Sequence, residues 1–121
     1  MNAYLIGLSW RDPEEVRAYV CAGLDDDPTC STGLFITAED KAAALSWGNE
    51  VCRKYMGYLF AGKNYSAKEL DIFCWVEAEP KNCPWTHCLD FFQRVQVGQD
   101  PEFLKMTAEA YVEWCNKAGI A

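Results

Sequence analysis

The segment from Thr37 to Phe60 constrains the fold of this chain most, because its apolar spacing and both of its ends indicate the same structure. Thr37 is a suitable N-cap, since its hydroxyl can accept a hydrogen bond from a backbone N–H two or three residues later. Glu39 and Asp40 add negative charge at the positive end of the helix dipole, and Gly62 is a suitable stop. The segment therefore predicts a long helix.

The apolar residues of this predicted helix form two adjacent stripes, which is more surface than one sheet face covers. The first consists of Ala38, Ala42, Leu45, Cys52, Met56 and Leu59, and the second of Ala44, Trp47, Val51, Tyr55 and Tyr58. A second neighbour is therefore expected. If it is a C-terminal helix that carries Met106 and Trp114, the long helix is structural. If it is another protein, the side with Trp47, Tyr55 and Tyr58 is a binding face.

Four segments predict strands. Apolar residues alternate with others over 3–10, 71–79 and 91–97, and Gly33 to Ile36 form a short apolar run after an acidic loop over 25–33. Because both faces of 3–10 are mostly apolar, this strand is expected at the centre of the sheet. The half-polar strand over 91–97 is expected at or near an edge.

The dipeptide Asp-Pro marks two predicted helix starts, at Asp12 and at Asp100, because aspartate caps a helix N-terminus and proline fits its first turn. The first helix is expected to run to about residue 22 and to bury one stripe against the sheet, formed by Val16, Tyr19, Val20 and Leu24. The second is expected to end at Gly119. A capping-box spacing between Ser66 and Glu69 predicts one short helical turn.

Together these elements predict one α+β domain over residues 1–121. The expected order is strand, helix, strand, helix, strand, strand, helix, with the short helical turn before the third strand. We expect a single-layer sheet of three to four strands, at least partly antiparallel, which three helices cover on one face. The chain has no repeat of fixed period and no linker that would separate two domains.

The balance of charge excludes some partners and favours others. The chain has 18 Asp and Glu against 11 Lys and Arg, a formal net charge of −7 and a pI near 4.6. Binding to nucleic-acid phosphates needs clustered positive charge, so nucleic acid is not expected as a partner, whereas a cationic protein is. No apolar run approaches the roughly 20 residues that span a bilayer, and a signal peptide is not recognisable. We therefore expect no membrane association and a cytoplasmic location.

The loop from Cys83 to Asp90 concentrates chemically capable side chains, among them the only histidine, His87. As a nucleophilic site, it would use His87 to activate the thiol of Cys83 or Cys88 and Asp90 to orient the imidazole. As a metal site, Cys83, His87 and Cys88 would be ligands, although the paired knuckles typical of zinc sites are missing. The odd total of 7 cysteines favours reduced thiols over a disulfide framework. No cofactor is expected.

Two hypotheses of function follow. The first is a small acidic interaction domain without catalytic activity that binds a cationic protein, and its expected contacts are Asp25, Asp26, Asp27, Trp85, Trp47, Tyr55 and Tyr58. In size, acidity and lack of a catalytic signature, the chain is similar to the immunity and inhibitor proteins that neutralise bacterial toxins, which is an analogy of kind. The second is a small enzyme, or a ligand or metal binder, that uses the loop from Cys83 to Asp90. Both a monomer and a homodimer fit the sequence.

Overall fold

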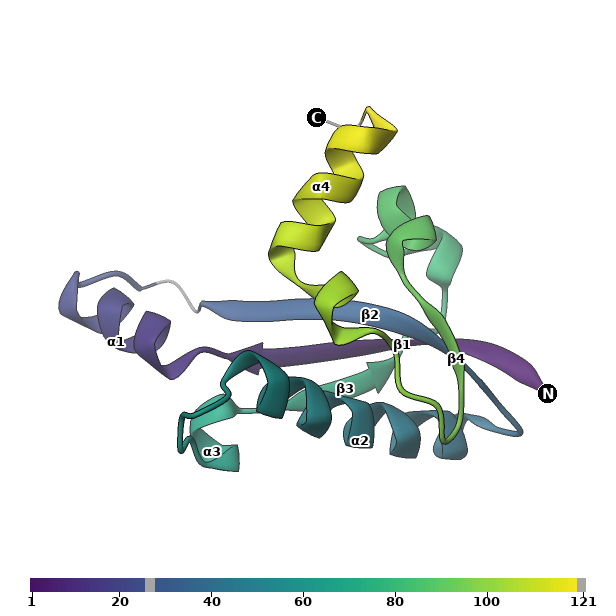
Figure 1. Ribbon diagram of the computed structural model, residues 1–121, viewed down its shortest axis with the longest axis horizontal. Helices are drawn as coiled ribbons and strands as arrows, with labels where there is room; N and C mark the ends of the chain where they lie inside the picture. Colours follow the sequence, from purple (N-terminus) through teal and green to yellow (C-terminus); the bar gives the residue numbers. More distant parts are fainter. Residues whose placement is uncertain (26–27, 120–121) are drawn as a thin grey trace.

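Four strands form one mixed sheet, in which the two long strands lie at the centre (Figure 1). The strands are β1 (Asn2–Arg11), β2 (Thr29–Ala38), β3 (Phe73–Val76) and β4 (Arg94–Gln96). Their order across the sheet is β3-β1-β2-β4, with β1 antiparallel to β2 and β3, and β4 parallel to β2. The predicted α+β class with a partly antiparallel sheet is confirmed, as are the central position of β1 and the edge position of β4.

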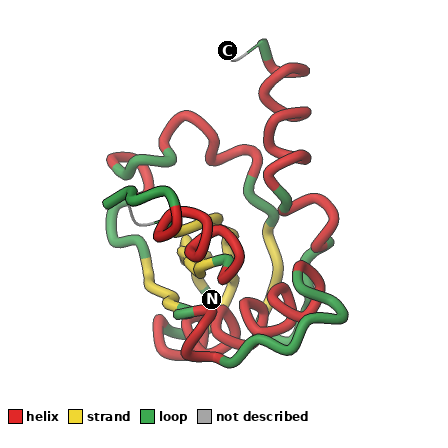
Figure 2. Tube along the Cα trace, turned by 90° about the vertical axis from the view of Figure 1, so that its left-hand side faces the viewer, coloured by secondary structure: helices red, strands yellow, loops and turns green. Residues whose placement is uncertain are grey.

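The structure is a computed structural model that describes residues 1–25 and 28–119. Within this part of the chain the α-helices are α1 (Pro13–Cys21), α2 (Lys41–Leu59), α3 (Ala67–Leu70) and α4 (Ala108–Ala118), and the short 3₁₀ helices are η1 (Pro80–Asn82), η2 (Thr86–Phe91) and η3 (Phe103–Met106). Figure 2 shows α4 standing out from the body of the molecule toward the C-terminus. Of the described helices, none has the length and apolarity needed to span a membrane. All seven cysteines are free thiols.

Three local signals read from the sequence are confirmed. Asp12 caps α1, and its Oδ1 accepts from the backbone N–H of Glu14 at 3.0 Å. Ser66 and Glu69 form both hydrogen bonds of a capping box at the start of α3. Gly119 follows α4 in the left-handed conformation, with φ of 73°, which glycine adopts at little cost.

The long helix starts later than the sequence predicts. Asp40, and not Thr37, is the N-cap of α2, because its Oδ1 accepts from the backbone N–H of Ala43 at 2.8 Å. Thr37 belongs to β2 instead, where it lies opposite Ala3 of β1. Its carbonyl accepts from the backbone N–H of Val97, so its backbone is bonded to the chain at the end of β4.

The second strand is longer than its apolar run indicates. The loop predicted over 25–33 ends early, because β2 already begins at Thr29 and continues to Ala38. Pairing with β1 explains this length: Arg11 lies opposite Thr29, and Asn2 lies opposite Ala38. The polar residues at the start of β2 are therefore held in the strand by pairing with β1.

The C-terminal helix also starts later than predicted. Its N-cap is Thr107, whose Oγ1 accepts from the backbone N–H of Ala110 at 3.2 Å. Asp100 does not cap a helix but pairs with Lys54 of α2, with 3.0 Å between Oδ1 and Nζ. The segment between Asp100 and Thr107 forms η3. The Asp-Pro signal at Asp100 is therefore overridden by the contact with Lys54, which is distant in the sequence.

The first helix does not bury the stripe predicted for it. α1 lies beyond one end of the sheet (Figure 1), and Pro13 is its only buried residue. Val20 is 72% exposed, and Leu24, which follows the helix, is 51% exposed. The spacing of these apolar residues correctly indicates a helix, but the sheet does not extend far enough to cover them.

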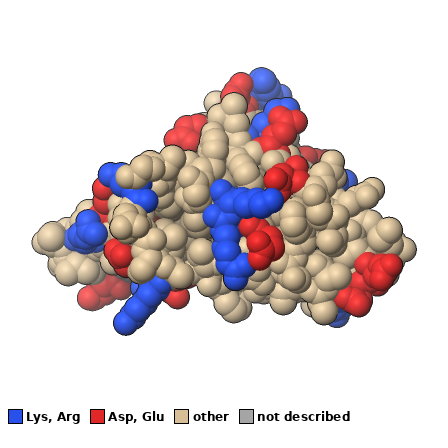
Figure 3. Space-filling view, turned by 60° about the horizontal axis from the view of Figure 1, so that its bottom comes forward, with Lys and Arg blue, Asp and Glu red and all other residues tan. Residues whose placement is uncertain are grey.

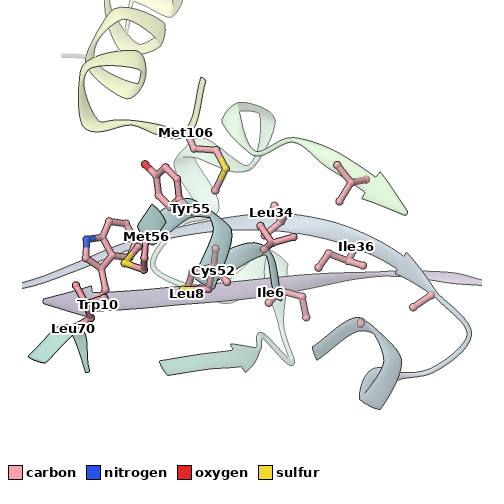
Figure 4. Close-up of a cluster of buried hydrophobic side chains, with 14 residues drawn as sticks. Ile6, Leu8, Trp10, Leu34, Ile36, Cys52, Tyr55, Met56, Leu70 and Met106 are labelled. Atoms are coloured by element: carbon pink, nitrogen blue, oxygen red, sulfur yellow. The ribbon is translucent and has the colours of Figure 1, made fainter. Parts of the chain in front are cut away.

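The main core lies between α2 and one face of the two central strands (Figure 4). Every second residue of these strands points into it, and these residues are Ile6, Leu8, Trp10, Leu34, Ile36 and Ala38. Gly48 allows the close approach of α2 to β1, because a Cβ at this position would lie 2.6 Å from Cγ2 of Ile6. Burying one such aliphatic side chain contributes roughly 1.5–3 kcal/mol, so this face supplies much of the stability.

The alternate residues point to the other face of the sheet and form a second core. Leu5 of β1 and Phe35 of β2 pack there with Cys83, Cys88 and Phe92, which lie in or beside η1 and η2. Side chains of α4 pack against the same cluster. Helical segments therefore cover both faces of the sheet, whereas one covered face was expected.

The second apolar stripe of α2 is covered by the chain itself. Phe103 of η3 stacks on Tyr55 with 5.8 Å between the ring centroids, and Trp47 donates its indole N–H to the carbonyl of Gln99 at 2.8 Å. The neighbour is therefore the segment that precedes α4 and ends at Met106, a member of the main core. Trp114, which was expected on this side, packs in the second core instead.

Charges are mixed on the side of the molecule that carries α2. Figure 3 views this side and shows basic and acidic side chains next to one another. Arg53 pairs with Glu50 within α2, and Lys63 pairs with Glu14 of α1 at 3.1 Å. Exposed pairs of this kind contribute about 0–1 kcal/mol each, so they add little stability but leave this side without a field of one sign.

We predict that Gly48→Ala and Gly57→Ala change the stability in opposite directions. Both lie in α2 and gain about the same helix propensity, but a Cβ at Gly57 meets nothing within 4 Å, whereas a Cβ at Gly48 meets Ile6. Gly57→Ala should raise the free energy of unfolding by about 0.5–1 kcal/mol. The free energy of unfolding of Gly48→Ala should be about 1–3 kcal/mol lower than that of Gly57→Ala. Urea unfolding measures both. Equal effects of the two substitutions would contradict the close packing of α2 on β1.

Candidate functional site

A cleft of about 720 Å³ lies at one end of β2, between the start of α1, the C-terminal end of α2, η2 and the start of α4. Seven aromatic side chains from both sides of the sheet line it: Trp10, Tyr55, Phe60, Trp85, Phe91, Phe92 and Tyr111. Its volume lies in the range of ligand-binding sites in proteins. We take this cleft as the candidate site, because it combines this size with polar groups in its lining.

One wall of the cleft belongs to the main core. Trp10 at the end of β1 meets the ring of Tyr55 edge to face, with 5.4 Å between the centroids. Tyr55 is only 1% exposed, and burial, followed by the negative charge of Glu109, raises the pKa of its hydroxyl to about 12. The hydroxyl of Tyr55 therefore stays uncharged at neutral pH.

The opposite wall depends on two glycines that face each other in the sheet. Gly7 of β1 and Gly33 of β2 are register partners, and neither has a side chain to cover the second face. The ring of Trp75 occupies the space at Gly7, where a Cβ would lie 2.3 Å from the indole. Trp85 lies over Gly33 and stacks on Trp75, with 5.7 Å between the centroids. The two glycines thus fix the position of Trp85 in the cleft.

Carboxylates are the charged groups of this cleft. Asp12 and Glu15 of α1 line one side, Glu109 of α4 lines another, and none of the described lining residues is Lys or Arg. Their field acts inside the cleft: after burial, Glu15 and Asp12 raise the pKa of the Cys30 thiol. A negative potential next to aromatic rings favours a positively charged ligand.

The loop from Cys83 to Asp90 contributes to the cleft only in part. Trp85, His87 and Cys88 line it, whereas Cys83 and Asp90 do not. Cys83 is buried and donates its thiol to the carbonyl of Pro80 at 3.1 Å. The four side chains of the predicted nucleophilic site are therefore not brought together.

The histidine of this loop meets a residue that the sequence did not single out. Nε2 of His87 lies 3.1 Å from the hydroxyl of Tyr111 in α4. Burial and the neighbouring thiols of Cys115 and Cys83 raise the pKa of Cys88, which keeps it protonated. An activated cysteine needs a lowered pKa, whereas the pKa of Cys88 is raised. In the described part of the chain, no three His, Cys, Asp or Glu side chains are placed to hold a metal ion.

The predicted partner contacts are dispersed in the structure. Trp85 and Tyr55 line the cleft from opposite walls. Trp47 lies elsewhere, under the Nζ of Lys54 at 5.0 Å, and Tyr58 is 42% exposed on α2. Asp25 is exposed and does not line the cleft, and Asp26 and Asp27 lie outside the described residues.

Several residues of the cleft were not predicted as site residues. Trp10 looked like a core residue, Asp12 and Glu15 like the start of a helix, and Glu109 and Tyr111 like parts of a terminal helix. Each of these interpretations is locally correct. The residues become one site only because the ends of β1, α1 and α4 meet, and no spacing within the sequence indicates that meeting.

We predict that the buried Tyr55 makes stability depend on pH in the alkaline range. The pKa of its hydroxyl is about 12 in the folded protein against an ordinary value of 10. The contribution of the protonated hydroxyl to the free energy of unfolding is therefore complete below pH 10 and is lost as the pH rises toward 12. The free energy of unfolding should fall by about 2–3 kcal/mol more in the native protein than in Tyr55→Phe. Urea unfolding at pH 9 and near pH 12 measures this difference. An equal fall in both proteins would contradict the buried position of the hydroxyl.

Comparison with known proteins gives no match: no protein-family model, no curated protein and no solved structure corresponds to this chain. The function is therefore argued from the residues of the cleft alone. Fold class by itself does not indicate an activity, because one architecture carries many functions.

Proposed function

We propose that this protein is a binding domain without catalytic activity, which takes a positively charged group of a partner protein into the cleft. The observation that supports this most directly is the composition of the lining. Aromatic rings form both walls, Asp12, Glu15 and Glu109 supply the charge, and no described lining residue is Lys or Arg. A lysine or arginine side chain matches such a site, because its stem is apolar and its end is cationic.

Two physical effects would act on the bound group, and a third would act on the approach of the partner. A cation within about 6 Å of an aromatic face gains about 0.5–2 kcal/mol, depending on how far it is desolvated. A hydrogen bond between the cation and a carboxylate is stronger than one between neutral groups. The formal net charge of −7 would also speed the encounter with a cationic partner at low salt. The proposal requires no nucleophile or metal.

A second candidate is a protein that binds a small organic cation in the same cleft, with the loop from Cys83 to Asp90 as one wall. The volume of about 720 Å³ supports this alternative, because small-molecule sites usually measure about 300–1,000 Å³. The hydrogen-bonded pair of His87 and Tyr111 would then supply polar contacts for the ligand. A site for a free cation and a site for a partner's side chain share this chemistry. They differ in one measurement: a peptide should bind more tightly than its isolated side chain only if the natural ligand is a protein.

We predict that N-acetyl-arginine amide binds in the cleft and that N-acetyl-citrulline amide does not. Citrulline has nearly the same shape as arginine but is neutral, so the comparison isolates the charge. Titration of ¹⁵N-labelled protein should shift the indole N–H resonances of Trp10 and Trp85, which line the cleft, more than that of Trp47, which does not. Equal binding of the two compounds would contradict the proposal.

Two double variants test whether the carboxylates of the cleft are responsible. E15Q/E109Q removes two lining charges, whereas E14Q/E113Q removes two charges from the same helices at positions that do not line the cleft. We expect E15Q/E109Q to weaken binding of N-acetyl-arginine amide about three- to tenfold, and the matched variant to weaken it less than twofold. An equal loss in both variants would indicate only long-range attraction and would contradict a site in the cleft.

A further inference from the structure

Among the described residues, no strand pairs with the outer edge of β2 where this strand enters the cleft. β2 extends over Thr29–Ala38, but β4 pairs only with Phe35, Ile36 and Thr37. Figure 1 shows β4 beside one part of β2, while the other part continues toward α1 without a strand on its outer side. Among the described residues, β3 is bonded to β1, so it does not cover this edge either. An unpaired edge is a template on which another extended chain can pair.

The direction of the backbone groups on this edge follows from the bonds that β4 makes. Phe35 donates its N–H to Gln93 at 2.9 Å, and Thr37 accepts from Val97 at 3.3 Å, so odd-numbered residues of β2 point their backbone groups outward. Backbone direction alternates along a strand, and Ser31 therefore points its N–H and C=O away from β1. Ser31 is exposed and lines the cleft. Its backbone N–H and C=O are thus directed toward the outer side of β2, where the described residues provide no strand partner.

The aromatic residues that cover the second face of β2 reach as far as Gly33. The rings of Phe92 and Trp85 lie over this glycine, at 3.1 Å from the position of a Cβ. Phe92 comes directly before the residue at which the chain begins to pair with β2, so the preceding segment leaves the sheet edge here and forms η2. In the described part of the chain, the segment before Gln93 therefore does not cover the edge of β2 before Gly33.

The two sides of this edge differ in chemistry. On the side of α2, Cys30 packs in the main core next to Trp10 and Tyr55, and the carboxylates of Asp12 and Glu15 act on its thiol. On the other side, the lining consists of apolar rings of the second core, among them Trp85 and Phe92. Side chains of a strand alternate between two faces. A strand added to this edge would meet acidic and aromatic groups with one set of side chains and apolar rings with the other.

We propose that the partner binds as an extended strand along the outer edge of β2 at residues 29–32, through a segment in which basic and apolar residues alternate. This inference rests on the proposed function, since it names the form in which the cationic group arrives. Backbone hydrogen bonds to Ser31 supply affinity that does not depend on sequence, and the two faces of the edge supply the selectivity. Charge complementarity selects a basic partner over a second copy of this acidic chain.

The probe is the heptapeptide acetyl-Lys-Val-Lys-Val-Lys-Val-Lys-amide, and its binding is followed by titration calorimetry. We expect it to bind more tightly than N-acetyl-arginine amide and more tightly than a peptide of the same composition with all valines before all lysines. Hydrogen exchange of the Ser31 N–H should slow in the complex. An unchanged exchange rate at saturating peptide would overturn strand addition.

Substitutions at Ser31 test the backbone bond from the side of the protein. Ser31→Pro removes the outward N–H at an edge position where proline is tolerated, and Ser31→Ala removes only the hydroxyl. We expect Ser31→Pro to weaken peptide binding at least about tenfold and Ser31→Ala to leave it within about twofold. Equal binding by both variants would overturn the proposal.

N-methylated peptides provide the same test from the side of the ligand and do not depend on whether Ser31→Pro folds. Methylation of the three valines removes the N–H groups of one edge of the bound strand, and methylation of three lysines removes those of the other. We expect one set to lose binding at least about tenfold and the other to bind normally, because only one edge of the peptide faces β2. Equal behaviour of the two sets would overturn strand addition.

These measurements separate the two proposals. If N-acetyl-arginine amide binds as predicted but the heptapeptide is insensitive to Ser31→Pro and to both methylations, the cationic site stands and strand addition is wrong. If neither compound binds, the proposed function itself is wrong. Binding of the free cation that is as tight as binding of the heptapeptide would favour the small organic cation as the ligand.

Discussion

The antiparallel ladder between β1 and β2 is the constraint on which the rest of the structure depends. Both strands have 10 residues, and their middle residues are buried on both faces, so the chain must cover two sides of one sheet. The residues with even numbers pack under α2, which approaches closely at Gly48. Those with odd numbers include the paired Gly7 and Gly33, and this gap in the side chains admits Trp75 and Trp85. The shape of the second face is therefore determined by residues that have no side chain.

Local signals predict the ends of elements well when the deciding contacts lie within a few residues. The cap at Asp12, the box formed by Ser66 and Glu69, and the stop at Gly119 are of this kind, and the structure confirms them. The cap predicted at Thr37 fails because β1 and β4 hold that residue in β2. Asp100 likewise satisfies a local rule but binds Lys54, which the sequence pattern does not place nearby. Tertiary contacts override the local preference in both cases.

The candidate site could be predicted only in part for the same reason. Trp85, His87 and Cys88 were found because they lie close together in a loop, and loops often carry functional groups. Glu15 and Glu109 are separated by most of the chain, and each resembles an ordinary charge at the start of a helix. Their common position depends on how α1 and α4 leave the ends of the sheet. Periodicity describes which face of an element is apolar, but it does not describe where two elements end relative to each other.

The open edge of β2 and the negative charge beside it have a common physical consequence. An exposed strand edge pairs with other chains without regard to their sequence, and proteins limit this by placing charge on or near the edge. Asp12, Glu15 and Glu109 would act in this way against a second copy of the chain, because two chains of formal net charge −7 repel one another. The same field would attract the basic strand that we propose as the partner. A single set of carboxylates would thus prevent self-association and admit a cationic partner, which explains how the fold can keep an unpaired edge next to apolar walls.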